Sequence, residues 1–370
     1  MPVSIVGVGK CLPGVDLPGR VVTNEEIIEI LLANKAIKPG SDKPWGPEEL
    51  TPQRIEDLIG VKERHWAARD QNTSDLALVA AEAALQDAQI GWEDVGMLIV
   101  GTSSPESFYP STACLVLNKI AKRKIVSGVW TEREAKEKLR IQASDVLAAC
   151  TSSIYAIDIV KNSLLQGDNE YEYGLAVGAE VMSRVLDFSD TNADLWGDGA
   201  GAVVLKRTNS KAGIIWTSLG SDSWGAELAY SRGMGTSSHY INTSPNVFIK
   251  GHEVQKFVLK IMCELITKTI EQANSSPGRN KKIKLDDISL FICHQANSRI
   301  FDFPAKKLKI PIEKFYINVD RRGNTSSASV LIALREALDE GRIKEGDLIM
   351  FISFGGGLTW ASMLVEWEKR

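Results

Sequence analysis

The sequence predicts a mixed α/β protein built from two similar halves. Short runs rich in β-branched residues alternate with helical patterns along most of the chain. From residue 74 in the first half and residue 252 in the second, both halves follow one order: helix, strand, helix, strand, helix, strand, strand. Asp94 opens DVGMLIVGT and Asp286 opens DDISLFICH, so Thr102 and His294 fall at equivalent strand ends.

The first half is expected to span residues 1–209. The β-branched run near the start predicts its first strand, and a helical spacing of apolar residues precedes the run GMLIVGT. In order, its predicted elements are strand 3–8, helix 74–88, strand 97–102, helix 111–120, strand 146–149, helix 152–166, strand 173–177 and strand 200–206.

The second half is expected to span residues 210–370. It opens on a long amphipathic pattern and ends on two adjacent apolar runs that are separated by glycines. Its predicted elements are helix 252–273, strand 289–293, helix 296–308, strand 315–319, helix 326–340, strand 347–353 and strand 359–367.

Two segments interrupt this alternation. Residues 35–53 contain four prolines and predict an irregular excursion. Residues 119–140 form a charged insertion, in which Thr131 and Glu134 have capping-box spacing and predict a short helix. This insertion fits a solvated flap, and a substrate lid or a partner contact stays open as the alternative.

Composition narrows the function classes. The chain has 370 residues, 44% of them hydrophobic, and a net charge of −4, which argues against a nucleic-acid-binding protein. It shows no signal peptide and no apolar run long enough to span a membrane, so we expect a cytoplasmic protein without a membrane partner. Five widely spaced cysteines without a CxxC pair predict free thiols rather than disulfides or a zinc site.

Two reactive side chains stand where predicted strands end. Cys150 lies between an apolar run and the predicted helix 152–166, and a helix amino terminus lowers the pKa of a thiol. The alternative is an inert cysteine buried in the core. His294 ends the run SLFIC, where it either polarises a substrate carbonyl or serves only as a structural hydrogen-bonding group.

Two further motifs complete the candidate site. Asn324, in RRGNTSS, either caps the next helix or donates a hydrogen bond to a developing oxyanion. The run 355–357 (GGG) is either a bulge or a place where backbone approaches a ligand closely. Because open α/β sheets bind ligands at the carboxyl ends of their strands, we expect Cys150, His294 and Asn324 to converge there. The run 197–201 (GDGAG) enters a strand and is not a nucleotide motif.

Taken together, these motifs resemble the β-ketoacyl-ACP synthase III family of thiolase superfamily condensing enzymes. HQAN followed by GNTS and then by GGG is far more specific than any single motif. The resemblance implies an α/β thiolase-like fold, in which two pseudo-duplicated βαβαβ halves pack as five layers, αβαβα. The motifs that carry it are AACTSS around Cys150, WGDGAGAVVL at 196–205, CHQANSRI at 293–300, GNTSSASV at 323–330 and FGGGLTWASMLV at 354–365.

The resemblance also implies a reaction without a metal or cofactor. Cys150 takes an acyl group from a thioester, and the N–H groups of Cys150 and Gly356 form the oxyanion hole. His294 and Asn324 then stabilise the enolate that malonyl-ACP forms when carbon dioxide leaves, and this carbanion attacks the acyl group. The family implies a homodimer that serves fatty acid or specialised polyketide-type biosynthesis.

Partner and pocket residues follow from the same resemblance. Tyr109 matches a position that reaches across the dimer interface into the partner's acyl pocket, and Trp196 shapes the pocket. Acyl carrier protein is expected to dock on a basic patch, for which a merely solvated helix face is the alternative. The residues that match this patch are Lys256, Arg299, Lys306 and Lys307.

Three positions depart from members that use coenzyme A. The tryptophan and arginine that grip the adenine nucleotide are replaced by Arg54 and Leu58, and a tunnel arginine is replaced by Asp190. These departures predict a primer carried on a protein or as an unusual thioester, in a specialised pathway.

Other functions on the same fold remain open. One is an acyltransferase that moves an acyl or malonyl group to an alcohol or amine without condensation. Another is a non-catalytic subunit of a heterodimer. A hydroxymethylglutaryl-CoA synthase fits less well, because no glutamate matches its general base.

Overall fold

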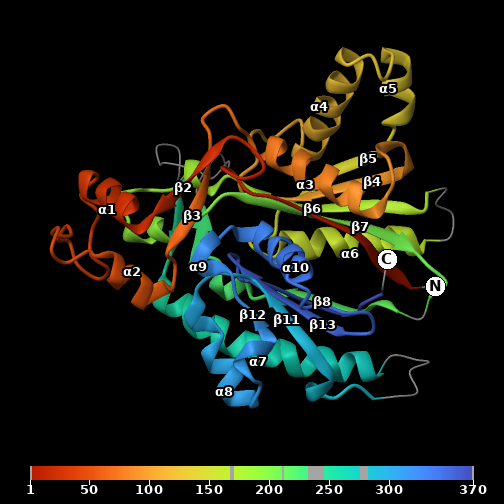
Figure 1. Cartoon of the computed structure of the whole chain (residues 1–370). Helices are drawn as coiled ribbons and strands as arrows, with labels where there is room; N and C mark the ends of the chain where they lie inside the picture. Colours follow the sequence, from red (N-terminus) through yellow and green to blue (C-terminus); the bar gives the residue numbers. More distant parts are fainter. Residues whose placement is uncertain (1, 167–170, 211, 232–245, 276–281, 369–370) are drawn as a thin grey trace.

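The structure is a computed structural model that describes residues 2–166, 171–210, 212–231, 246–275 and 282–368. Two five-stranded sheets form its core (Figure 1). The first contains β1 (Val3–Cys11), β4 (Val95–Gly101), β5 (Gln142–Val146), β6 (Tyr173–Glu180) and β7 (Gly199–Arg207). The second contains β8 (Gly213–Ser221), β11 (Ile288–Cys293), β12 (Phe315–Tyr316), β13 (Leu348–Gly355) and β14 (Thr359–Glu366).

The two sheets repeat one topology. The strand order is β1-β7-β6-β4-β5 in the first and, from its other edge, β8-β14-β13-β11-β12 in the second. Counted within each half, both sheets therefore have the order first, fifth, fourth, second, third. β4 pairs parallel with both of its neighbours, and β11 does the same. The predicted internal repeat is present, while the exact boundary at residues 209 and 210 stays a prediction.

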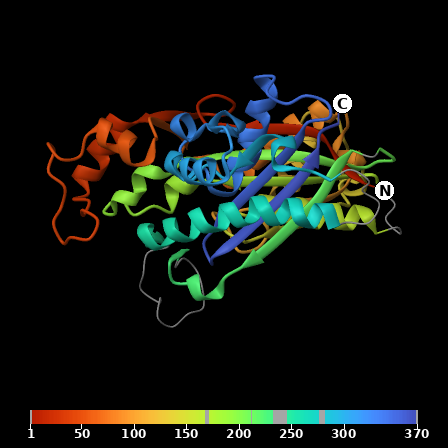
Figure 2. The same cartoon turned by 90° about the horizontal axis from the view of Figure 1, so that it is seen from below.

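Helices separate and cover the sheets, which gives the five layers. α6 (Ser152–Leu165) and α10 (Ser329–Asp339) lie between the sheets in one core that takes residues from both. α3 (Thr73–Ala88) and α4 (Thr112–Val126) cover the outer face of the first sheet. α7 (Gly251–Ser275) and α8 (Asp302–Leu308) cover the second, and Figure 2 shows α7 running across it.

Burial explains the sequence patterns of these elements. β4 (VGMLIVG) and β6 (YGLAVGAE) are apolar along most of their length because helices cover both faces of the sheet. α10 is buried around nearly its whole circumference, as its apolar run VLIAL requires. At Gly178 the halves meet closely, since a Cβ there would come within 2.6 Å of the Ser327 carbonyl oxygen. Only glycine fits this contact.

Smaller elements lie around the core. α1 and α2 lie at one end of the molecule, and α4 and α5 form an arm that projects from the first sheet, away from α1 and α2 (Figure 1). No helix in the described part of the chain could cross a membrane. The strands and α-helices are β2 (Gly19–Thr23), α1 (Asn24–Ala33), α2 (Pro52–Ile59), β3 (Glu63–Ala67), α5 (Glu132–Lys138), β9 (Ala229–Ser231), β10 (Val247–Ile249) and α9 (Val319–Arg322). The 3₁₀ turns are η1 (Trp92–Asp94), η2 (Met182–Arg184), η3 (Thr191–Leu195), η4 (Ser223–Gly225), η6 (Leu285–Asp287), η7 (Ser298–Ile300), η8 (Ile312–Lys314) and η9 (Ser326–Ala328).

Both inserted segments are present, but their predicted bounds are inexact, because α2 begins at Pro52 and α4 continues to Val126. Residues 34–51 contain no helix or strand. α5 begins with the predicted capping box, because the Thr131 hydroxyl accepts from the Glu134 N–H at 3.2 Å and the Glu134 carboxylate accepts from the Thr131 N–H at 2.7 Å. The role of this arm stays a prediction.

Several predicted boundaries are wrong. Of the strand predicted at 146–149, only Val146 belongs to β5; the next residues form a turn, because Ala149 has φ +50° and cannot continue a strand. The helix predicted at 296–308 begins as η7, where the Asn297 side chain accepts from the Arg299 N–H, and only α8 is α-helical. The strand predicted at 315–319 shortens to β12, and β8 was not predicted.

Candidate active site

Cys150 lies in the sharp turn that joins β5 to α6. The Ser152 hydroxyl closes this turn, since it accepts from the Ala148 N–H at 2.8 Å and donates to the Ala149 carbonyl at 2.7 Å. The Cys150 carbonyl accepts from the Ser353 hydroxyl at 2.9 Å, which ties the turn to β13 of the other half. The turn therefore holds the thiol at the junction of the two sheets.

The environment of Cys150 favours the neutral thiol. Burial raises the pKa of the Cys150 thiol to about 12, although the Ser326 hydroxyl, 3.4 Å from Sγ, acts in the lowering direction. The sequence predicted a lowered pKa from the position at a helix amino terminus, and the shift goes in the opposite direction. Removal of the thiol from water outweighs the effect of the helix amino terminus on its pKa.

His294 follows β11 and is held from three sides. Its N–H donates to the Ile352 carbonyl at 2.7 Å, and its Nδ1 lies 2.7 Å from the Ser329 hydroxyl. The ring meets Phe354 edge-on, with centroids 5.2 Å apart. Burial lowers the pKa of His294 to about 3, so the imidazole is neutral at physiological pH. A neutral imidazole can donate one hydrogen bond to a substrate oxygen.

Asn324 is held by its backbone and its Oδ1, which leaves the side-chain nitrogen Nδ2 available to a ligand. Its backbone pairs with the segment before β7, with its N–H donating to Leu195 at 2.8 Å and its carbonyl accepting from Gly197 at 3.0 Å. Its Oδ1 accepts from the Ser326 N–H at 2.8 Å. In the described part of the chain, Nδ2 has no hydrogen-bond partner, so this group can donate to a ligand.

A single turn connects the three predicted residues. Asn324 begins it, Ser326 contacts the Cys150 sulfur, and Ser329 contacts the His294 ring. The three contacting residues lie within the six residues 324–329, which keeps the side chains of Cys150, His294 and Asn324 in one neighbourhood. The predicted convergence at the strand ends is therefore present in the geometry, while the catalytic roles stay predictions.

Gln295 ties the end of β11 to the helix that leads into Asn324. Its Nε2 donates to the Cys293 carbonyl at 2.9 Å and to the Tyr316 carbonyl at 3.0 Å. Its Oε1 accepts from the N–H groups of Asn318 at 3.0 Å and Val319 at 3.2 Å. Every hydrogen-bonding position of this buried amide is used, so Gln295 sets the spacing between β11 and α9.

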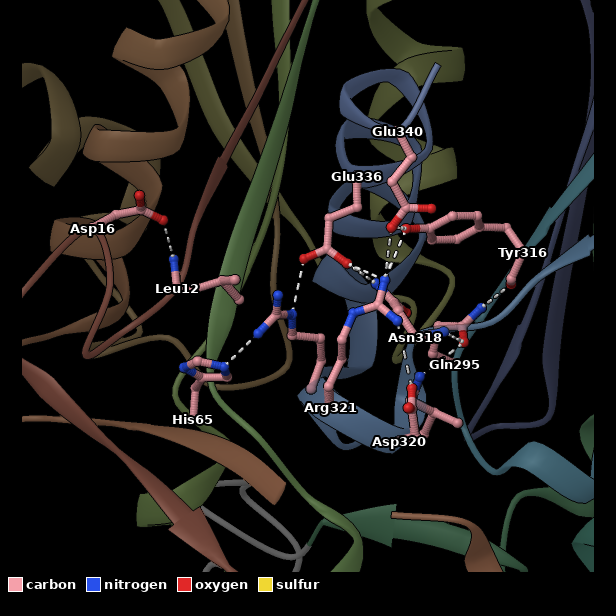
Figure 3. A network of polar contacts seen from close by, with 12 residues as sticks. Leu12, Asp16, His65, Gln295, Tyr316, Asn318, Asp320, Arg321, Glu336 and Glu340 are labelled. Carbon is pink, nitrogen blue, oxygen red and sulfur yellow. Dashed lines mark hydrogen bonds and ion pairs between the residues drawn. The ribbon is translucent and has the colours of Figure 1, made fainter. Parts of the chain in front are cut away.

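A charged network braces α9 from the other side (Figure 3). The buried Glu336 carboxylate accepts from Arg322 Nε at 2.8 Å, from Arg321 Nη2 at 3.2 Å and from Asn318 Nδ2 at 3.0 Å. Arg322 also donates to Nε2 of His65 at 2.8 Å. The arginines in RRGN therefore hold the turn that starts at Asn324.

Glu180 is a fully buried carboxylate at the end of β6, close enough to Cys150 to raise the pKa of its thiol. Burial also raises the pKa of Glu180 itself. Donors from both halves occupy its two oxygens, so it holds the seam together and is not a free base. They are the Thr102, Ser104 and Ser327 hydroxyls and the Ser103 and Ser327 N–H groups.

The glycine run after β13 lies against the backbone of Cys150. A Cβ on Gly355 would come within 2.6 Å of the Cys150 nitrogen, and a Cβ on Gly356 within 2.7 Å of the Ala229 carbonyl oxygen. These positions therefore require glycine, and they bring main chain beside the thiol. An oxyanion hole formed by the N–H groups of Cys150 and Gly356 is compatible with this packing and stays a prediction.

The two predicted pocket residues lie in different surroundings. Trp196 is 4% exposed, and its backbone forms a bridge with Asn324. Tyr109 is 87% exposed, and within the described residues its side chain makes no hydrogen bond or ring contact to Cys150, His294 or Asn324. A small hollow adjoins Trp196 and carries two carboxylates; its lining is Leu186, Asp187, Asp190, Asn192, Ala193, Trp196, Val247 and Ile249.

The predicted docking residues are all exposed, on α7, η7 and α8. Arg299 donates to the Asp57 carbonyl of α2, so η7 and α2 are neighbours. Lys307 lies 5.4 Å from the centre of the Phe303 ring. The patch therefore borders the helix that carries Arg54 and Leu58.

Sequence reasoning missed the residues that support the site. Gln295, Ser326 and Ser329 lie inside the motifs CHQANSRI and GNTSSASV, but these motifs predict catalytic roles only for His294 and Asn324. Glu180 is the last residue of β6, an apolar strand. A buried polar residue directly after an apolar run was the available signal, because such a group requires partners.

Comparisons with known proteins agree on one family. The family described as 3-oxoacyl-[acyl-carrier-protein (ACP)] synthase III matches residues 144–223, and its C-terminal counterpart matches residues 279–367. A β-ketoacyl-[acyl-carrier-protein] synthase III from Caldanaerobacter subterraneus is 38% identical over 316 residues, covering 84% of this chain and 88% of the relative. One from Clostridium perfringens is 36% identical over 364 residues, covering 95% and 97%.

The chain belongs to the β-ketoacyl-ACP synthase III family. A solved structure of the Thermus thermophilus synthase covers 99% of this chain and all of the other, with a TM-score of 0.79 at 34% identity. The predicted thiolase-like fold and the predicted family are thereby confirmed. Members of this family are acyl-transferring condensing enzymes.

Proposed function

We propose that this enzyme loads an acyl group on Cys150 and condenses it with malonyl-ACP. The observation that carries the proposal is the turn Asn324–Ser329, which contacts Cys150 through Ser326 and His294 through Ser329. A nucleophile and two neutral hydrogen-bond donors gathered around one turn suit thioester transfer followed by enolate stabilisation.

In the first half-reaction, the Cys150 sulfur attacks the carbonyl of the acyl thioester. The thiol loses its proton, the new carbon–sulfur bond forms, and the carrier leaves as a thiol. The N–H groups of Cys150 and Gly356 would bind the tetrahedral oxyanion. Because burial opposes a free thiolate, proton loss and attack are expected to occur together.

In the second half-reaction, His294 and Asn324 donate to the thioester carbonyl of malonyl-ACP. Loss of carbon dioxide then leaves an enolate whose charge these donors stabilise. The carbanion attacks the acyl carbon on Cys150, the carbon–sulfur bond breaks, and the Cys150 thiolate takes up a proton. The product is a β-ketoacyl-ACP.

Intact-mass measurement tests this function directly. Incubation with a panel of acyl thioesters should add one acyl group to Cys150, and Cys150→Ser should stay unmodified. Addition of malonyl-ACP should then release carbon dioxide and form the β-ketoacyl product. Transfer to an alcohol or amine with the malonyl carboxylate retained would support the non-condensing acyltransferase, and an unmodified Cys150 across the panel would support the non-catalytic subunit.

We also propose that the primer arrives on a carrier protein rather than on coenzyme A. Arg54 already stacks on Trp45, with its guanidinium carbon 4.8 Å from the ring centre. Asp187 and Asp190 line the hollow beside Trp196, where carboxylates oppose the phosphates of a coenzyme A. Acetyl-ACP should therefore label Cys150 faster than acetyl-CoA, and efficient labelling by acetyl-CoA would contradict this part of the proposal.

The carrier would dock on the basic patch of Lys256, Arg299, Lys306 and Lys307. These exposed cations form a local positive surface on an acidic chain, which suits an acidic carrier. A double charge reversal of Lys306 and Lys307 should raise KM for malonyl-ACP while leaving acylation by a small thioester unchanged. Raising the salt concentration should weaken binding of the wild type in the same way.

We propose a homodimer that pairs through β5. This strand lies at the edge of the first sheet and leads directly into the exposed Leu147. Its Asp145 carboxylate accepts from the Thr112 N–H at 2.6 Å, a few residues after the exposed Phe108 and Tyr109. Pairing would cover this apolar surface and bring Tyr109 toward the partner's pocket.

We also expect the cytoplasm as the compartment, because all five cysteines are free.

A further inference from the structure

Within the described residues, Ser329 makes the only hydrogen bond to the His294 ring, and it does so at Nδ1. It is the first residue of α10 and is 1% exposed. Its hydroxyl oxygen lies 2.7 Å from His294 Nδ1 and 3.3 Å from the Gln295 backbone nitrogen. Both contacts are buried, so water does not compete for them.

The donors and acceptors of this pair can be assigned. The Gln295 N–H can only donate, so the Ser329 oxygen is the acceptor in that bond. The hydroxyl proton then needs an acceptor of its own, and within the described residues the Ser329 side chain makes no hydrogen bond besides these two. Its proton therefore points to His294 Nδ1, which must carry a lone pair.

A neutral imidazole that accepts at Nδ1 carries its proton on Nε2. The alternative tautomer would turn an Nε2 lone pair toward the site, and a lone pair repels a developing enolate oxygen. No described residue bonds to Nε2 in the structure. Nε2 is thus the ring atom left to meet a substrate.

We infer that Ser329 is a positioning residue that keeps His294 in the Nε2–H form and thereby makes it a hydrogen-bond donor. This inference rests on the proposed function for its consequence in catalysis. Ser329 touches no reacting atom. It serves only the half-reaction in which His294 acts, so loading of Cys150 is independent of it.

The first test measures the tautomer without any substrate. The chain has four histidines, and ¹⁵N-histidine labelling with a His294→Ala reference assigns the His294 signals. The wild type should show Nδ1 as the bare nitrogen and Nε2 as the protonated one. In Ser329→Ala the two shifts should move toward each other, while Ser329→Thr should keep the wild-type pattern. Ser362→Ala, which removes another buried serine bonded to a hydroxyl at 2.6 Å, should not change them.

The second test separates the two half-reactions. Ser329→Ala should acylate Cys150 within about 2-fold of the wild type but decarboxylate malonyl-ACP about 10- to 100-fold more slowly, short of the about 100- to 1000-fold lost when a donor itself is removed. Ser329→Thr should recover most of the decarboxylation rate.

Three results would overturn the inference. They are a protonated Nδ1 in the wild type, unchanged His294 shifts in Ser329→Ala, and an equal loss of both half-reactions in a folded Ser329→Ala. Failure of the proposed function looks different, because a wild type that neither acylates nor decarboxylates would still report its His294 tautomer.

Discussion

At the residue scale, His294 is expected to work as a neutral donor across the whole working range of pH. Burial lowers its pKa to about 3, well below the ordinary 6.5, so the ring gains a proton only in acid. The rate of malonyl-ACP decarboxylation should therefore show no inflection near pH 6.5. Stopped-flow detection of carbon dioxide between pH 5 and 8 checks this, and a tenfold fall centred on pH 6.5 would contradict it. In Asn324→Ala, the rate of malonyl-ACP decarboxylation should be about 100- to 1000-fold lower than in the wild type at every pH.

Cys150 leads to a second prediction at this scale. Because burial raises the pKa of the thiol to about 12, the thiolate fraction grows tenfold with each pH unit below that value. Alkylation of Cys150 by iodoacetamide should be slow at pH 7 and should rise tenfold per unit between pH 8 and 10. Peptide mass spectrometry separates it from the exposed Cys114. Ser326→Ala removes a contact that lowers the pKa and should slow alkylation, and a plateau below pH 9 would refute the assignment.

At the scale of elements, Gln295 links β11 to α9, so its loss should lower the free energy of unfolding more than the loss of a typical buried amide. Gln295→Glu keeps the shape but loses both donors, so the Cys293 and Tyr316 carbonyls are left unpaired beside a buried carboxylate. Each unsatisfied buried group costs about 1–3 kcal/mol, so the free energy of unfolding should fall by about 2–6 kcal/mol. Urea titration measures this. Gln86→Glu, on the exposed face of α3, should change it little, and equal stability of both variants would show that the link is dispensable.

The elements also show what the sequence could predict. Long buried elements such as β4, α6 and α10 were predicted because the spacing of their apolar residues follows from which sides of the strand or helix are buried. The turn after β5 was mistaken for strand because Leu147, Ala148 and Ala149 are apolar, although φ at Ala149 turns the chain. Cys150, His294 and Asn324 were predicted from their motifs, and their catalytic roles stay predictions. Ser329 and Gln295 were missed because their partners are distant in sequence, and only the folded chain shows which polar groups meet.

At the scale of the whole molecule, the internal repeat and the difference between its two sheet edges favour β5 as the surface of the proposed dimer. β5 and β12 occupy the same place in the repeat, each at a sheet edge, yet β5 has five residues and β12 only two. Short edge strands resist pairing, whereas a longer edge with apolar neighbours invites it. The first sheet therefore has the edge suited to a second copy.

This asymmetry gives a prediction with a built-in control. Leu147 is 74% exposed next to β5, and Ile312 is 44% exposed just before β12. Leu147→Glu places a charge in the proposed interface, where burial of an unpaired carboxylate is costly, so it should convert the dimer to a monomer. Ile312→Glu should remain dimeric. Light scattering after size exclusion gives both masses, and a monomeric wild type or a dimeric Leu147→Glu would place the interface elsewhere. If Tyr109 enters the partner's pocket, the monomeric variant should also lose its discrimination between short and long acyl primers while Cys150 still accepts them.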